Sequence, residues 1–220
     1  MIFPWFKLDP NERLAARILI REIGVFGALG LGRWIRKEAK RGRPFDEIEA
    51  ADCKEERLSR AQIGPAILMY EGLRARVGKE RALRITEEVV VEAACLFLRD
   101  SIGPLRRRDL ERLDPKRREG FVRERGNRFF NATVEWDEIS SKAVVFTVKH
   151  CRFPPLCERL GVSELAPLFC KGDAKYFGTV EPDVSLARPR TIAGGSSDCL
   201  FDLRWSEVGD DEDDERRSKE

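Results

Sequence analysis

The chain has 220 residues, of which 42% are hydrophobic and 36% are charged, with a formal net charge of +2. This apolar content is typical of a globular core and excludes wholesale disorder, and the length suits one compact domain or one core with a helical extension. The nearly balanced charge argues against nucleic acid as a partner, because phosphate binding needs a sustained basic surface.

The N-terminal part of the chain predicts neither a signal peptide nor a membrane span. Residues 1–7 lack the charged start and the long apolar centre of a signal peptide. The hydrophobic run over 14–31 is interrupted by Arg17, Arg21 and Glu22, so we expect no membrane partner. We therefore expect a cytoplasmic protein whose six cysteines are reduced thiols.

The first half of the sequence predicts helices. Asp9-Pro-Asn-Glu12 is a plausible helix start, because Pro10 suits a first turn, and the glycines from Gly24 onward weaken that helix locally. We expect a short connecting helix within 44–56, and then two helices over 63–77 and 79–98, joined at Gly78.

The segment 104–119 is almost purely charged. Its acidic residues interleave with its arginines, which favours a solvated helix or loop over an anion-binding site.

Strand character begins near Phe129. Segments 132–136, 143–148, 184–193 and 200–205 read as strands, the last two joined across a turn at Gly194. Between the two pairs, helices are expected over 156–160 and 163–170, with Ser163 as a cap.

This pattern predicts an α+β fold, in which N-terminal helices pack on a small antiparallel sheet with a helical insertion. We divide the chain into a helical region (1–128) and a sheet region with the helical insertion (129–206), which together form one compact domain. The run over 207–220 is predicted to be a disordered acidic tail.

Four cysteines lie within the last third of the chain, and a thiol beside a carboxylate or a cation can be tuned toward a thiolate, a nucleophile or a ligand. Cys170 and Asp173 share a face if their helix continues, whereas Gly172 would instead permit a sharp turn. Cys199 follows a glycine turn, where a backbone can approach a ligand closely. Cys151 ends a predicted strand.

A purely structural role competes with each of these functional interpretations. A free cysteine often behaves as a small buried hydrophobe, and we interpret Cys53 and Cys95 as structural. His150 is the only histidine, which excludes a multi-histidine metal site within one chain. A metal bound by the cysteines and Asp173 is chemically admissible, but the spacing does not demand it. We predict no metal and no cofactor.

The last third of the chain resembles the L-2-amino-thiazoline-4-carboxylic acid hydrolase family. The resemblance covers about sixty residues and rests on a strand that ends in Cys151, a Leu-Gly-x-x-Glu-Leu stretch (160–165), Cys170-x-x-Asp173, Thr-Ile-Ala-x-Gly (191–195) and Cys199-x-Phe201. One element departs from the pattern: members often read Cys-Asp-Phe-Arg at the last motif. Either Leu200 replaces the acidic residue, or Asp202 and Arg204 serve from a shifted register.

The resemblance implies a hydrolase that opens a cyclic amidine, or a related C–N bond, in a small carboxylated substrate. Such chemistry needs a nucleophile, a proton donor for the leaving nitrogen and a cation for the substrate carboxylate. The matching positions make Cys170 the candidate nucleophile and Asp173 the candidate acid/base, with Cys199 also at the catalytic site. Substrate binding falls to the remaining motif residues, with Arg188 as carboxylate clamp: Cys151, Arg188, Thr191 and Gly194.

A second hypothesis stays open beside the enzyme, namely a non-catalytic sensor or small-ligand-binding module that keeps the family pocket. The altered Cys199-Leu-Phe motif and the strongly charged surface keep this hypothesis open. A homo-oligomer is compatible with the sequence under either hypothesis.

Overall fold

A computed structural model describes residues 8–103, 105–180 and 184–205. The chain divides into two compact units: unit 1 comprises residues 1–97 and 152–172, and unit 2 comprises residues 98–151 and 173–220. Two helices, α3 (Lys79–Ile102) and α7 (Ala166–Lys175), contribute residues to both units. The sequence-based division at residue 128 stays a prediction. The predicted acidic tail over 207–220 lies outside the described residues.

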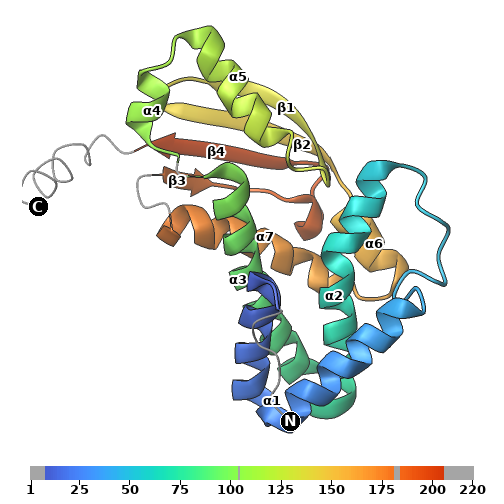
Figure 1. Cartoon of the computed structure of the whole chain (residues 1–220). Helices are drawn as coiled ribbons and strands as arrows, with labels where there is room; N and C mark the ends of the chain where they lie inside the picture. The colour runs from blue at the N-terminus through green and yellow to red at the C-terminus, as the bar shows by residue number, and fades with distance from the viewer. Residues whose placement is uncertain (1–7, 104, 181–183, 206–220) are drawn as a thin grey trace, which may run out of the picture. The chain divides into compact units, whose positions relative to one another are not determined.

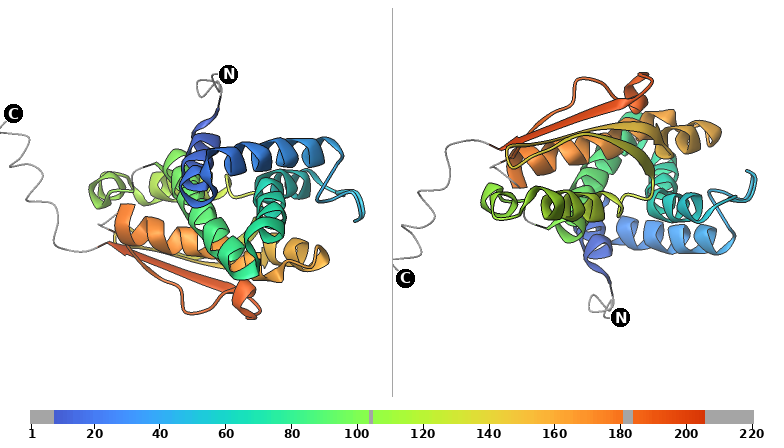
Figure 2. Two further views of the ribbon diagram at one scale, coloured as in Figure 1. Left: turned by 90° about the horizontal axis from the view of Figure 1, so that it is seen from below. Right: turned by 90° about the horizontal axis from the view of Figure 1, so that it is seen from above.

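Unit 1 begins with the long helix α1 (Pro10–Lys40), which starts where the sequence predicts. The backbone N–H of Glu12 donates to the Asp9 carboxylate over 2.9 Å and the Glu12 carboxylate accepts from the Asp9 N–H over 3.1 Å, a reciprocal cap. Gly24 has φ +73° and breaks the helix, so that its two halves run in different directions (Figure 2). A positive φ is strained for other residues, and this explains glycine here.

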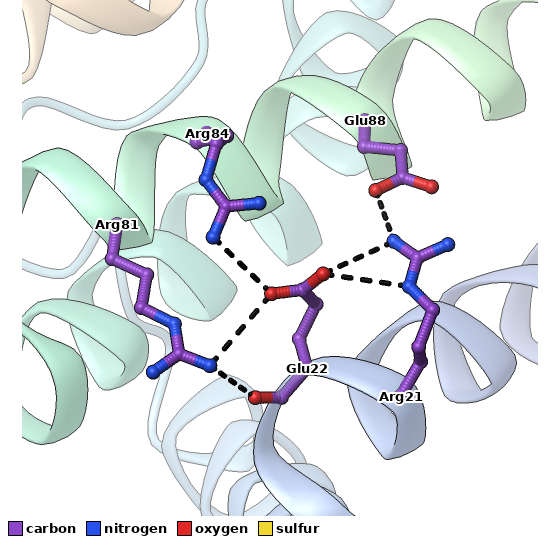
Figure 3. A network of polar contacts seen from close by, with 5 residues as sticks. All are labelled: Arg21, Glu22, Arg81, Arg84 and Glu88. Carbon is purple, nitrogen blue, oxygen red and sulfur yellow. Dashed lines mark hydrogen bonds and ion pairs between the residues drawn. The ribbon is translucent and has the colours of Figure 1, made fainter.

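An ion-pair network fixes the break in α1. The Glu22 carboxylate lies 3.3 Å from both Arg21 and Arg84, and Arg81 donates to the Glu22 carbonyl over 2.6 Å. Arg21 also pairs with Glu88, and Figure 3 shows these side chains bridging α1 and α3. A helix break leaves carbonyls without intrahelical donors, and Arg81 supplies one.

The two predicted helices on either side of Gly78 are confirmed as α2 (Lys54–Val77) and α3. However, α2 begins at Lys54 rather than at residue 63, and Cys53 caps it by accepting from the Glu56 N–H over 3.4 Å. The predicted connecting helix over 44–56 is wrong, because residues 41–53 form turns, bends and irregular backbone. Arg60 donates to the Glu49 carbonyl over 2.7 Å and so ties this segment to α2.

Close helix contacts build the core of unit 1. A Cβ at Gly72 would overlap Leu31 and Trp34, and one at Gly172 would overlap Ala94. Glycine therefore lets α1 approach α2 and lets α7 approach α3. α7 continues without a break through Gly172 as far as Lys175, so the alternative of a sharp turn at Gly172 is wrong.

The helical insertion begins with α6 (Phe153–Arg159), which confirms the first predicted helix of this region. A 3-10 turn (Ser163–Leu165) then leads into α7. The predicted cap at Ser163 is wrong: Ser163 lies inside the 3-10 turn, and its predecessor Val162 makes no side-chain cap.

Unit 2 contains a four-stranded antiparallel sheet in the order β1-β2-β4-β3 (Figure 1). Its strands are β1 (Ala132–Ile139), β2 (Ala143–Cys151), β3 (Val184–Ala187) and β4 (Cys199–Trp205). With the helices between β2 and β3 it confirms the α+β fold. The third strand ends at Ala187 rather than at residue 193, because the chain turns away there and forms a 3-10 turn (Ile192–Gly194).

The two faces of this sheet differ in polarity. Cross-strand neighbours on one face are mainly apolar, including Val144 opposite Leu203 and Phe146 opposite Phe201. On the other face, the Thr147 hydroxyl donates to Asp137 over 2.9 Å. Alternation along a strand produces this division.

The charged segment after Gly103 forms α4 (Arg107–Glu111) and α5 (Pro115–Gly126). Several of their arginines bind carboxylates or backbone carbonyls within unit 2. Arg107 pairs with Glu111 over 2.7 Å, and Arg118 donates to two backbone carbonyls of residues 110 and 113. α5 meets the apolar sheet face, since a Cβ at Gly126 would overlap Trp136. None of the helices within residues 8–103, 105–180 and 184–205 contains an apolar stretch that could span a bilayer.

Candidate functional site

The centre of the candidate site in unit 2 is an ion pair between Asp173 and Arg188. Asp173 lies in the last turns of α7, and Arg188 directly follows β3. The Arg188 Nη1 atom donates to Asp173 Oδ2 over 2.6 Å, and the side chains are only 10% and 25% exposed. Burial raises the pKa of Asp173 to about 6 although Arg188 lowers it, so desolvation outweighs the ion pair. This carboxyl group can therefore exchange a proton near neutral pH.

The apolar face of the sheet supports the guanidinium group. Arg188 Cζ lies 5.0 Å from the centre of the Phe201 ring, which stacks on Phe146 with 4.7 Å between centroids. A cation over an aromatic face is attracted by the ring quadrupole. Phe201 and Phe146 thus fix Arg188 from the side of the sheet, while Asp173 holds it from α7.

Cys199 is the third member of the site. It is the first residue of β4, is 6% exposed and accepts a hydrogen bond from the Ile192 N–H at its sulfur over 3.1 Å. Burial raises the thiol pKa, whereas the Ile192 amide and the charge of Arg188 lower it, and the charge of Asp173 raises it. Asp173, Arg188 and Cys199 are therefore electrostatically coupled.

Thr191 and Gly194 shape the turn that carries this amide. The Gly194 N–H donates to Thr191 Oγ1 over 3.0 Å, and the Ser196 N–H donates to the Thr191 carbonyl over 3.0 Å. Gly195 has φ +94° and ends the turn. Both residues predicted to bind substrate thus have a local backbone role here, and their substrate contact stays a prediction.

Cys151 lies beyond the end of β4. Cys199 pairs with Val148, whereas Cys151 pairs with Ala132 on β1, and the Asn131 side-chain amide donates to its sulfur over 3.8 Å. Cys170 belongs to unit 1, so its convergence with the residues of unit 2 stays a prediction. Among the residues that the structure describes, no group of three or more His, Cys, Asp or Glu side chains could hold a metal ion.

The structure bears on one of the two alternatives for the departure from the family pattern. Asp202 and Arg204 pair with each other over 2.9 Å. They alternate along β4 with Cys199 and Phe201, so they lie on the opposite face of the sheet. The alternative in which these two residues serve beside Cys199 is therefore not supported.

Sequence reasoning missed three partners of the site: Phe201, the Ile192 amide and the Arg190–Asp198 ion pair. Phe201 stands in the Cys-x-Phe motif and Asp198 directly precedes Cys199, so two of them were visible as motif neighbours. The contact of a backbone amide with a sulfur leaves no signal in the sequence.

The Glu164 of the Leu-Gly-x-x-Glu-Leu stretch has a structural role in unit 1. Its carboxylate accepts from the buried Tyr70 hydroxyl over 2.7 Å and lies 3.2 Å from the Lys79 ammonium group. Burial, and after it the hydrogen bond to Glu164, raises the pKa of Tyr70 to about 12. The motif thus anchors the 3-10 turn before α7 to α2 and α3.

Comparison with known families agrees with this pattern of motifs. The model of the L-2-amino-thiazoline-4-carboxylic acid hydrolase family matches residues 56–203, which include most of α2 and nearly all of the sheet. The chain belongs to the L-2-amino-thiazoline-4-carboxylic acid hydrolase family. No curated protein matches the chain.

Proposed function

We propose that this protein hydrolyses a C–N bond of a cyclic amidine in a small carboxylated substrate. The family assignment supports a hydrolase. The observation that carries the proposal is the partly buried Asp173 carboxyl group, whose pKa is raised to about 6 beside Arg188. A group of this kind can both give and take a proton near neutral pH.

In the proposed reaction, Cys170 is the nucleophile and Asp173 is the acid/base. The Cys170 sulfur adds to the amidine carbon, the second electron pair of the ring C=N bond moves to the ring nitrogen, and this nitrogen takes the proton of the thiol. The ring C–N bond then breaks, its electron pair moves to the nitrogen, and the Asp173 carboxyl group supplies a proton there. Water next attacks the same carbon, gives a proton to the Asp173 carboxylate and releases the thiol.

Substrate binding is assigned to Arg188, with Cys151, Thr191 and Gly194 nearby in the family motifs. A guanidinium group recognises a carboxylate with paired N–H donors, and Phe201 and Asp173 already fix the orientation of Arg188. Cys199 would face the substrate as a thiol whose proton affinity depends on the charges of Asp173 and Arg188. It is the alternative nucleophile, although burial raises its pKa and so disfavours its thiolate.

The test is turnover of 2-aminothiazoline-4-carboxylate by purified protein as a function of pH. Asp173→Asn should lower kcat about 100-fold or more, because general acid–base catalysis typically contributes at least that. The wild-type rate should fall above about pH 6, where Asp173 loses its proton. An Asp173→Asn variant with wild-type rate and pH profile would contradict the role of Asp173.

The nucleophile is tested by Cys170→Ser and Cys199→Ser, with Cys157→Ser as a control for a buried cysteine outside the motifs. Cys170→Ser should abolish turnover and preserve the fold. Cys170 should also react with a small alkylating reagent near neutral pH faster than Cys53 or Cys95. If Cys170→Ser keeps most of the activity, the assignment fails and Cys199 becomes the candidate.

A non-catalytic ligand-binding module is the second candidate. The raised thiol pKa of Cys199 and the ion pair that engages Arg188 favour it. Such a module would be stabilised against thermal unfolding by cyclic amidines and small carboxylates, while no product would accumulate. A thermal-shift screen run beside the turnover assay separates the two functions.

A further inference from the structure

A second ion pair closes the loop that connects β3 to β4. Arg190 donates through Nε to Asp198 Oδ1, and their side chains are 44% and 18% exposed. Within the loop, Thr191 accepts from the amides of Gly194 and Ser196. The loop is therefore tied at its base by the ion pair and braced inside by backbone hydrogen bonds.

This ion pair stands next to both ends of the contact between the Ile192 amide and the Cys199 sulfur. Arg190 precedes Ile192 by two residues, and Asp198 is the neighbour of Cys199 in the chain. The N–H···S distance of 3.1 Å therefore depends on how the Arg190 side of the loop is held against the Asp198 side. We propose that Arg190 and Asp198 are positioning residues, whose ion pair holds the Ile192 amide on the sulfur of Cys199 and thereby favours the thiolate.

The charges around Cys199 explain why both partners are needed. Asp198 and Asp173 disfavour a thiolate at Cys199, and Arg188 favours it. Arg190 neutralises Asp198, and its own pKa is raised chiefly by the hydrogen bond to Asp198 and further by Asp137 of β1 and by Cys199. Lys149 of β2 also acts on Asp198.

Loss of Arg190 therefore has two effects of the same sign. The Ile192 amide loses its support, and the Asp198 charge beside Cys199 is no longer offset. Both effects disfavour the thiolate. Arg190 is 44% exposed, and an ion pair whose cation faces water adds little to folding stability. The loss should therefore appear at the sulfur and not in the unfolding temperature.

The experiment is an NMR titration of protein labelled with ¹³C at the cysteine Cβ atoms, with the Cys199 signal assigned from Cys199→Ser. At a fixed alkaline pH at which the fold is intact, Arg190→Gln should lower the thiolate-to-thiol ratio of Cys199 about tenfold, equivalent to about one pKa unit. Arg190→Lys keeps the charge but loses the fork geometry, and it should give a smaller decrease.

Arg204→Gln is the matched control, because Arg204 pairs with Asp202 on the other face of β4. This substitution should leave the Cys199 signal unchanged. An unchanged Cys199 titration in Arg190→Gln, or an equal change in Arg204→Gln, would overturn the proposal. If Arg190→Gln does not fold, Arg190→Lys decides: a wild-type titration overturns the proposal and a decrease supports it.

The consequence for turnover rests on the proposed function, but the titration does not. A protein that turns over no cyclic amidine and still shows the Arg190→Gln decrease would refute the function alone. Normal turnover with an unchanged Cys199 titration would refute the positioning role alone.

Discussion

Each unit contains a carboxylate bound by arginine, and the two settings differ in their surroundings. In unit 1, Glu22 meets three arginines whose side chains are 50–63% exposed. In unit 2, Asp173 pairs with Arg188, which is only 10% exposed. Burial raises the pKa of Asp173 to about 6. An arginine cluster open to water serves to fix a helix break, whereas a desolvated one-to-one pair can transfer protons.

The largest expected difference follows from replacing each carboxylate by an amide. The pKa of Asp173 in the folded protein, about 6, lies above its ordinary value of 3.8. Its contribution to stability is therefore fully present below about pH 3.8 and is lost as the pH rises through about 6. At neutral pH, the free energy of unfolding of Asp173→Asn should therefore exceed that of wild type by up to about 3 kcal/mol. Urea unfolding from about pH 4 to about pH 8 measures this, and a constant difference across that range would contradict it.

A smaller effect is expected at the partner of Asp173. Arg188→Gln leaves the Asp173 charge partly buried and uncompensated, so we expect a loss of about 2 kcal/mol at neutral pH. The loss should shrink near pH 5, where Asp173 is protonated. Unfolding of Arg188→Gln at the two pH values checks this, with Arg204→Gln as a control in which the arginine is 57% exposed.

Glu22→Gln should lower the free energy of unfolding, whereas Asp173→Asn should raise it. It leaves Arg21, Arg81 and Arg84 close together without their shared carboxylate, so we expect a destabilisation of about 1 kcal/mol. Turnover should be unchanged. Thermal unfolding of Glu22→Gln and Asp173→Asn in parallel gives the comparison directly, and equal signs would refute it.

The smallest effect is that of salt. Raising the ionic strength should reduce the destabilisation caused by Glu22→Gln by about half, because exposed charges are screened. The advantage of Asp173→Asn should persist, since desolvation and not long-range attraction causes it. Unfolding at about 0.05 M and about 1 M salt distinguishes the two responses.

Local signals in the sequence predicted much of the fold. The helix start at Asp9, the helix boundary at Gly78 and the strands of the sheet all depend on residues close in the chain. The predictions that failed depended on distant partners. The Glu49 carbonyl, in the non-helical segment 41–53, is bound by Arg60 of α2, and Ala94 requires glycine at position 172 within a continuous helix.

The sequence by itself determined the α+β class and the motif positions Asp173, Arg188 and Cys199, because capping, periodicity and motif spacing are local properties. Only the tertiary structure decided that Asp173 pairs with Arg188, that Phe201 supports the guanidinium group and that the Ile192 amide meets the Cys199 sulfur. These contacts join α7, the loop after β3 and β4. Their effect on proton affinity depends on burial, which arises only when the sheet and helix pack together.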